Sequence, residues 1–408
     1  MRIAGVIVEY NPFHNGHLYH LQKTKKQTEA DLVIAVMSGN FLQRGEPALL
    51  SKWTRTRLAL QAGADLVVEL PYVYATQKAD VFAWGAVSIL DLLGTTDLCF
   101  GSENGSTAPF LRTLEVLEEN RDFFNQQLKK RIASGISYPQ ALNLAFSDLH
   151  LTGDDFIDLS QPNNILGFHY VEAVVKRKSA IRVSTIKRQK AGYNQATISD
   201  AHIASATAIR RAIFSGEDFN HLQNLVPPYT YEALTQARQN RTLRRWDDFF
   251  PLLKYRILTT SADEIAEFYE AEEGLENRLK KHIRQAKNFS NWMERIKTKR
   301  YTWTRLQRLC THILTGAKKA EMRPAAQFAP PTYIRLLGMN EYGQLHLNSI
   351  KKRLNVPIIS KVGRNEEALM AIDLRAADCY RLIQPASDPS EFDCVPIRFD
   401  HASKTFVR

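Results

Sequence analysis

The first twenty residues constrain the fold more than any other stretch of this chain. Residues Ile3 to Val8 form a short run that is almost entirely apolar and rich in β-branched side chains. Such a run is typical of a strand buried on both faces of a parallel sheet. It stops at Asn11-Pro12, where proline lacks an amide and restricts its neighbour, so a turn is expected. A helix is predicted next, from His17 to about Gln27.

Two histidines, His14 and His17, flank the predicted start of this helix, with Gly16 between them. Backbone N–H groups at a helix start hold phosphate oxygens, and a glycine lets the ligand approach closely. Imidazoles placed there can stabilise charge on an α-phosphate and a leaving pyrophosphate, each donor contributing roughly 10² to 10³ in rate. The pattern therefore predicts displacement at phosphorus without a protein nucleophile. A surface turn with two solvated histidines is the alternative, and the flanking strand and helix disfavour it.

The tetrapeptide His14-Asn15-Gly16-His17 resembles the H-x-G-H signature of the nucleotidyltransferase superfamily, which also includes class I aminoacyl-tRNA synthetases. Downstream, the segment from Ile203 to Arg210 resembles the second signature of that superfamily, I-S-S-T-x-x-R, which meets the β- and γ-phosphates. Ser205, Thr207 and Arg210 match it, whereas Ala204 and Ala206 depart from it. An ordinary Ser/Thr-capped helix is the alternative for this segment. No K-M-S-K-S sequence is found, which argues against a synthetase.

Strand and helix patterns alternate through the first half of the chain. Further strands are expected at Asp31–Ser38, Asp65–Leu70, Asp97–Phe100 and Ile181–Ile186, and helices at Ser51–Ala62, Gln77–Leu93, Ala108–Ser134 and Pro162–Lys176. This alternation predicts a parallel sheet with right-handed crossovers. Later helices are expected at Trp246–Leu258, Ala262–Ala286, Phe289–Thr298 and Thr302–Ala320, with late strands near 356–362 and 395–399.

The predicted fold class is therefore α/β: a Rossmann-like parallel-sheet nucleotidyltransferase domain followed by a mainly α-helical domain. A length of 408 residues favours two domains. We place the nucleotidyltransferase domain at residues 1–228 and the mainly helical, RNA-binding domain at residues 229–408.

The ligand of an open parallel sheet lies beyond the carboxyl ends of its strands. The first strand leads there into residues 9–17, the fourth leads to Gly101, and the last leads to Arg188. Asn163 begins the preceding helix and can hydrogen-bond adenine or ribose, while Arg188 can pair with phosphate. A turn glycine, a plain helix cap and a surface arginine are the ordinary alternatives.

The composition excludes several classes of protein. No apolar run approaches the roughly 18 residues of a membrane span, and residues 1–2 lead straight into a strand rather than a signal peptide. The four cysteines are scattered without a C-x-x-C pair, which argues against a zinc site and fits a reducing compartment. We expect a cytoplasmic protein and assign no residue as a metal ligand, which leaves open whether Mg²⁺ has a fixed protein ligand.

The net charge of +11 is concentrated in one place. Residues 276–325, the basic block, contain 14 Lys and Arg against three acidic residues, so the rest of the chain is close to neutral. A local basic block is typical of a polyanion contact. Its centre interleaves cations with Tyr301 and Trp303, as phosphate contacts around a stacking platform would. The candidate RNA contacts are Arg295, Lys297, Lys299, Arg300 and Arg305; a solvated basic face with both aromatics in the core is the alternative.

Four ordered motifs carry a more specific resemblance. They are V-E-Y-N-P-F-H-N-G-H at 8–17, S-G-N-F-L-Q-R-G-E-P-A at 38–48, G-A-D-L-V-V-E-L-P at 63–71 and P-N-N-I-L-G at 162–167. Together they resemble the bacterial tRNA(Met) cytidine acetate ligase family over about the first 210 residues. The resemblance implies that ATP and acetate give acetyl-adenylate, whose acetyl group passes to N4 of the wobble cytidine of elongator tRNA(Met).

By the same resemblance, His14 and His17 are the catalytic residues. The implied ATP contacts are Ile7, Val8, Glu9, Tyr10, Asn11, Pro12, Phe13, Asn15, Gly16, Leu18, Tyr19, His20, Gly101, Asn163 and Arg188. ATP is expected as a substrate with Mg²⁺ as its complex. Acetate and elongator tRNA(Met) are the expected partners, with no membrane and no protein partner implied.

The loop from Asn40 to Lys52 follows the second strand and is a candidate lid over acetate, with Arg44 or Lys52 neutralising it; a solvated basic loop is the alternative. Two other functions stay open. One is a small-molecule adenylyltransferase of the H-x-G-H superfamily that acts without RNA. The other is a non-catalytic RNA-binding protein, which the presence of both histidines disfavours.

Overall fold

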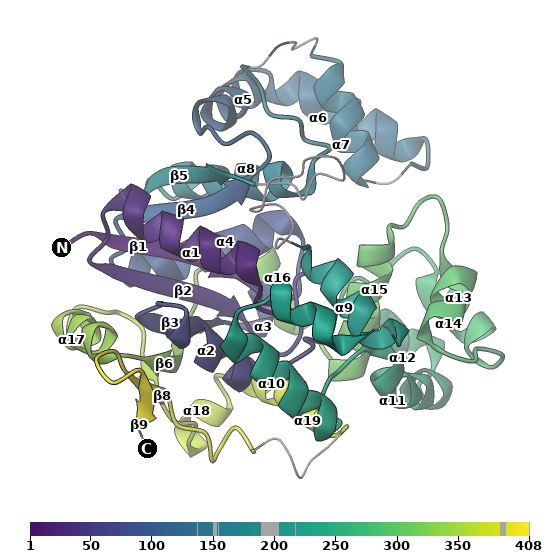
Figure 1. Ribbon diagram of the computed structural model, residues 1–408. Coiled ribbons are helices and arrows are strands. Elements are labelled where there is room, and N and C mark those ends of the chain that lie inside the picture. Colours follow the sequence, from purple (N-terminus) through teal and green to yellow (C-terminus); the bar gives the residue numbers. More distant parts are fainter. Residues whose placement is uncertain are drawn as a thin grey trace.

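The fold is built on one twisted mixed sheet (Figure 1). The computed structural model describes residues 1–136, 138–149, 153, 155–188, 204–216, 218–383 and 389–407. Its parallel strands are β1 (Ile3–Val8), β2 (Leu32–Ser38), β3 (Leu66–Leu70), β4 (Asp97–Ser102) and β5 (Arg182–Lys187), in the order β5-β4-β1-β2-β3. The predicted Rossmann-like sheet is confirmed. Since β1 pairs with both β2 and β4, the strand order reverses there, and the crevice of the sheet lies between β1 and β4.

Helices cover both faces of the sheet, which is why its central strands β1 and β2 are apolar at nearly every position. One face packs against α1 (Asn15–Thr28), α2 (Lys52–Gln61) and α10 (Pro228–Gln239). The other packs against α4 (Ala79–Leu92), α8 (Pro162–Lys176) and α17 (Glu341–Ile350). Successive residues of β2 divide between the two cores, Val33, Ala35 and Met37 on one side and Leu32, Ile34 and Val36 on the other.

A small helical insertion separates β4 from β5 and forms the upper part of Figure 1. It contains α5 (Ala108–Glu119), α6 (Arg121–Ala133) and α7 (Tyr138–Ser147). The helical sequence predicted at 108–134 is confirmed, and it forms two helices because the backbone turns at Asn120 before α6 begins. A short helix, α3 (Tyr72–Ala75), follows β3 directly.

The helical region has a hydrophobic core of its own. After α9 (Ala206–Ser215) and the 3₁₀ turn η1 (Phe219–Asn224) come α10, α11 (Trp246–Thr259), α12 (Ala262–Ala266), α13 (Leu275–Ile283), α14 (Phe289–Ile296), α15 (Trp303–Thr315) and α16 (Lys319–Ala326). Phe249, Leu279, Trp292 and Leu309 are fully buried there. The helices beyond residue 243 are confirmed, and a division at residue 228 stays a proposal.

Two of the predicted helices are shorter than expected. The helix predicted at 262–286 is interrupted between α12 and α13, where Glu270, Glu273 and Gly274 adopt left-handed backbone conformations. The helix predicted at 302–320 ends at Gly316, another left-handed cap. Both glycines were visible in the sequence as stop signals.

The end of the chain returns to the sheet. Strand β6 (Ile334–Met339), which the sequence patterns did not predict, pairs antiparallel with β3 and covers its free edge. It then pairs with β7 (Ile358–Ile359) and β8 (Ile397–Asp400), and β9 (Thr405–Val407) completes the edge, while α18 (Arg364–Glu367) and α19 (Ala371–Arg381) lie between them. Residues 334–407 are therefore not an extension of the helical core alone.

A buried ion cluster joins this C-terminal segment to the parallel strands. The Lys52 ammonium, 1% exposed, lies 2.7 Å from Glu69 Oε2 and 3.0 Å from Glu391 Oε2. Of the two residues expected to neutralise acetate, Lys52 is therefore disfavoured, because its charge is used by two buried carboxylates. Arg44, by contrast, is exposed on the same loop.

We expect Lys52→Met to lower the free energy of unfolding by about 3–5 kcal/mol, because it removes the cation shared by buried Glu69 and Glu391 and leaves only Arg335 beside Glu391. Urea unfolding at neutral pH measures this change. The exposed Lys78→Met is the control and should stay within about 0.5 kcal/mol of the parent. Equal midpoints for the two variants would contradict a structural role for the cluster.

Candidate active site

The H-x-G-H segment forms the start of α1, and its histidines cap the helix. The His14 ring nitrogen Nδ1 accepts a hydrogen bond from the Gly16 N–H at 3.0 Å, and His17 Nδ1 accepts one from the His14 N–H at 3.3 Å. The two rings stack with their centroids 3.7 Å apart. The helix begins at Asn15 rather than at the predicted His17, because an imidazole takes the place of the usual Ser, Asp or Asn cap.

These hydrogen bonds decide the protonation of both rings. Since each Nδ1 accepts a backbone N–H, a neutral ring must carry its proton on Nε2. Burial, together with the nearby Arg188, lowers the pKa of His14 to about 4, and burial lowers the pKa of His17 well below its ordinary value. Both rings are therefore neutral near pH 7 and present an Nε2–H donor each.

Aromatic packing holds the turn before α1. Tyr10 and Phe13 are buried, their rings meeting edge to face at 4.6 Å, and Tyr10 also packs against His17 at 5.0 Å. Asn11 Oδ1 accepts the Leu49 N–H at 2.7 Å. Residues 7–20, which the family resemblance implies as ATP contacts, are one continuous segment from the end of β1 into α1. Within it, the side chains of Tyr10, Pro12 and Phe13 are buried by protein.

Gly101, Asn163 and Arg188, which were predicted from the ends of strands and the helix between them, lie close together beside this segment. Asn163, in the first turn of α8, accepts a hydrogen bond from Arg188 Nη1 at 2.9 Å. Gly101, in β4, faces the Arg188 side chain, which would lie 3.4 Å from a Cβ at that position. Arg188 also lowers the pKa of His14, His17 and His20, after burial as the main cause, so its charge reaches the histidines.

The second signature lies on the opposite side of the H-x-G-H turn. Ser205 caps α9 by accepting the Ala208 N–H, and Thr207 is exposed in its first turn. Arg210 reaches across, donating to the Asn11 carbonyl at 2.8 Å and to Glu46 Oε2 at 2.8 Å. Ile203, which directly precedes the positions compared with that signature, lies outside the described residues. The structure thus brings Arg210 to the site.

Several buried polar atoms around the crevice lack a partner. Within the described ranges, none is found for Tyr10 Oη, Asn11 Nδ2, His20 Nε2 or Glu103 Oε2. Buried polar groups are nearly always hydrogen-bonded, so each unpaired one is a candidate contact for a ligand or a water molecule. Glu103 was missed as a candidate, although the sequence places it directly after the fourth strand, as it does Gly101.

The basic block is only partly available to a polyanion. Arg300 pairs with Glu273, Arg305 with Glu272 and buried Arg308 with Glu270, three acidic residues in the break between α12 and α13. Tyr301 is 6% exposed and belongs to the helical core, so only Trp303 fits the predicted stacking platform. Arg295 and Lys299 are exposed, and the described residues provide no carboxylate partner for either.

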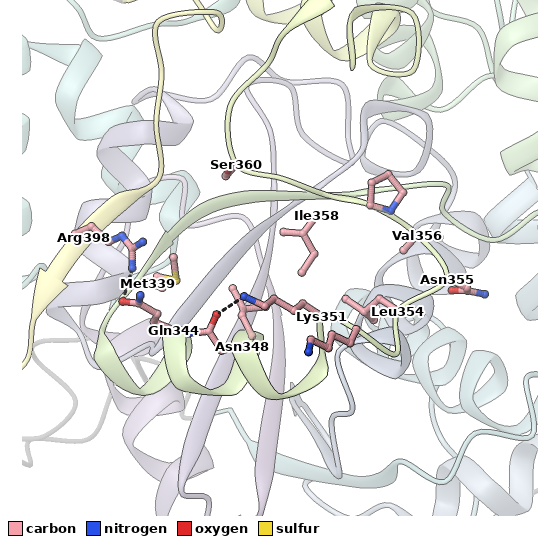
Figure 2. A pocket seen from close by; sticks show the side chains of 13 residues that line it. Met339, Gln344, Asn348, Lys351, Leu354, Asn355, Val356, Ile358, Ser360 and Arg398 are labelled. Carbon is pink, nitrogen blue, oxygen red and sulfur yellow. Dashed lines mark hydrogen bonds between the residues drawn. The ribbon is translucent and has the colours of Figure 1, made fainter. Parts of the chain in front are cut away.

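A groove of about 800 Å³ lies far from this site (Figure 2). It runs between α17 and the segment around β7, with Lys351 bonded to Asn348 and Arg398 to Gln344. Met339, which lines it, pairs with Leu66 at the beginning of β3. The groove therefore lies toward the amino ends of the parallel strands, opposite the edge that carries His14 and His17.

The described residues contain no group of three or more His, Cys, Asp or Glu side chains arranged to hold a metal ion. Among these residues, no helix has the length and apolar character needed to cross a bilayer.

The fold and the site define a class of protein: a nucleotide-binding α/β protein with an H-x-G-H turn at the switch point of its sheet. The model of the HIGH Nucleotidyl Transferase family matches residues 1–393. Relatives called tRNA(Met) cytidine acetate ligase are 49% identical in Halalkalibacterium halodurans, covering 98% of both chains, and 46% identical in Bacillus licheniformis, covering 100% of both.

Solved structures agree with these relatives. Thermotoga maritima TmcAL bound with alpha-thio ATP superimposes with a TM-score of 0.88 at 31% identity, over 98% of this chain and 100% of that one. Its apo form gives the same TM-score at 32% identity over the same shares. The chain belongs to the HIGH nucleotidyl transferases and, within them, to the tRNA(Met) cytidine acetate ligase family.

The depressed histidine pKa values predict how stability depends on pH. Between the ordinary value of 6.5 and about 4, the unfolded chain binds protons on His14 and His20 that the folded state excludes, so stability falls as pH falls through this window. His14→Asn keeps a capping oxygen but cannot titrate, so its thermal midpoint should drop less between about pH 7 and about pH 5. The exposed His221→Asn is the control, and parallel curves for all three proteins would contradict the assignment.

Proposed function

We propose that this protein is an ATP-dependent ligase that activates acetate as acetyl-adenylate and transfers the acetyl group to N4 of the wobble cytidine of elongator tRNA(Met). The observation that carries the proposal is the pair of neutral imidazole donors at the start of α1, gathered with Arg188 and Arg210 in a chain of this family. The choice of tRNA and acetate as substrates rests on the name of the relatives. The choice of ATP as the molecule attacked rests on the hydrogen-bond donors of the site.

In the first step, an acetate oxygen attacks the α-phosphorus of ATP. A P–O bond to the acetate forms while the bond to pyrophosphate breaks, giving a mixed anhydride. We assign His14 and His17 the task of donating Nε2–H bonds to the phosphate oxygens as charge develops on them. Arg188 and Arg210 are proposed to hold the phosphates in place, with Ser205 and Thr207 beside the β- and γ-phosphates.

In the second step, the exocyclic N4 amine of cytidine attacks the acetyl carbonyl carbon. A C–N bond forms, the amine loses a proton and AMP leaves. We propose that Mg²⁺ enters as the ATP complex and neutralises phosphate charge when bound. The exposed Arg44, near the buried Glu9, is the remaining candidate on the 40–52 loop for contact with acetate. We expect the enzyme to act in the cytoplasm, because ATP and tRNA are both available there.

Replacing either catalytic histidine should slow adenylate formation. We expect His14→Ala and His17→Ala to reduce acetate-dependent ATP–pyrophosphate exchange by roughly 10²-fold or more, with ATP affinity changed by less than about tenfold, because the donors act mainly in the transition state. His14→Asn separates capping from donation, since it restores the cap without the Nε2–H. The exposed His221→Ala is the control, and an exchange rate unchanged in either alanine variant would refute the assignment.

The tRNA contact is proposed to use the basic block around Lys299 and Arg300, where the half-exposed Arg300 can exchange Glu273 for a phosphate. If about six of its cations meet phosphates, tRNA affinity should fall about 10³-fold between roughly 50 and 200 mM salt, while ATP affinity changes far less. Reversing Lys297, Lys299 and Arg300 to Glu should abolish tRNA acetylation and spare pyrophosphate exchange. Both can be measured on the same preparation.

A matched control reverses Lys351, Lys352 and Arg353, three exposed cations far from the histidines, with the same change in charge. It should leave acetylation unchanged. If exchange and acetylation fall together in the first variant, its residues are structural. If neither falls, the RNA surface lies elsewhere, and a small-molecule adenylyltransferase that acts without RNA becomes the better description.

A further inference from the structure

Glu103 occupies a distinctive position at the end of β4. One of its carboxylate oxygens, Oε1, accepts the Asn163 side-chain N–H at 2.6 Å, and its own backbone N–H donates to Asn164 Oδ1 at 3.1 Å. The other oxygen, Oε2, is buried and has no partner among the described residues. Leaving a buried carboxylate oxygen without a hydrogen bond costs free energy. The unpaired Oε2 therefore indicates that a ligand provides a hydrogen-bond donor at this point.

Glu103 Oε2 is an acceptor, whereas the neighbouring side chains offer donors or are already paired. The Asn163 amide is used at both ends, its nitrogen by Glu103 and its oxygen by Arg188. The Arg188 guanidinium has donors only, as do the two histidine Nε2–H groups. A nucleotide brings acceptors on its phosphates and donors on its nucleoside, and a carboxylate repels the first and attracts the second.

We propose that Glu103 Oε2 accepts a hydrogen bond from a donor of the nucleoside, either a ribose hydroxyl or the exocyclic amine of adenine, and so selects the nucleotide. Through Oε1, the same carboxylate fixes the Asn163 amide with its oxygen toward Arg188. Glu103 is therefore a specificity residue at one oxygen and a positioning residue at the other. This inference rests on the proposed function only in taking ATP as the ligand.

The test compares nucleotide affinities by isothermal titration without acetate or tRNA. The probes are ATP, 2′-deoxyATP, 3′-deoxyATP and purine riboside triphosphate, each analogue lacking one of the three donors. We expect the parent to bind one analogue roughly 10- to 100-fold more weakly than ATP, the usual range for a hydrogen bond to a charged group. The analogue that loses affinity identifies the donor.

Glu103→Gln is the informative variant. Its amide oxygen can still accept from Asn163, but the group replacing Oε2 is then an NH₂ donor that cannot accept. We expect ATP affinity to fall to that of the weak analogue, and the preference between the two nucleotides to fall below about threefold. Glu115→Gln, an exposed carboxylate of α5 with the same change in charge, should retain the full preference.

Two results would overturn the proposal. One is a parent protein that binds all three analogues as tightly as ATP. The other is a Glu103→Gln variant that weakens every nucleotide equally, since a carboxylate that merely caps α8 would act in that way. Glu103→Ala, which loses both contacts, should weaken every nucleotide further without restoring any preference. Absent pyrophosphate exchange with the nucleotide preference intact would instead refute the ligase reaction and leave Glu103 in its role.

Discussion

One buried guanidinium holds together the edge of the sheet on which the site depends. Arg55 of α2 is inaccessible to solvent, and it donates to the carbonyls of Glu9, Ser38 and Leu50 at 2.7–3.0 Å and also to that of Gly39. Three of these carbonyls, those of Glu9, Ser38 and Gly39, lie where β1 and β2 end, and that of Leu50 lies just before α2. Burial lowers the pKa of Arg55 to about 10, which still leaves it charged at neutral pH. The loop after β2 is thereby fixed against the H-x-G-H turn.

The same loop, residues 40–52, also contacts the helical region through Gly45. The Gly45 carbonyl accepts from Trp246 Nε1 at 3.0 Å and from the Thr311 hydroxyl at 2.8 Å, and a Cβ on Gly45 would lie 2.5 Å from the Arg308 backbone nitrogen. Gly45 also has φ +74°, so glycine is needed there for two reasons. The loop that packs beside the proposed adenylation site is consequently also in direct contact with the helical region that carries the basic block.

The histidines serve the fold and the chemistry with the same hydrogen bonds. Because each Nδ1 caps α1, each Nε2 is left as the donor, and the cap that begins the helix also selects the tautomer. Burial keeps the rings neutral, so they donate hydrogen bonds without bringing two positive charges into a stacked pair. Protonation would break the cap, since Nδ1 could no longer accept. Helix stability and a catalytically useful protonation state therefore change together with pH.

The sequence by itself determined the parallel sheet, the H-x-G-H turn and the strand-end residues, because strands buried on both faces and turns marked by proline and glycine are local signals. Gly101, Asn163 and Arg188 could be grouped because parallel strands end at one edge. Tertiary structure alone decided the rest. Strand β6 is set by the open edge of β3, not by its own pattern. The charge of Lys52 and Arg308 is neutralised by Glu69 and Glu270, distant in sequence, so counting cations along the chain overstates the basic surface. The free oxygen of Glu103 also exists only because Asn163, 60 residues away, occupies the other.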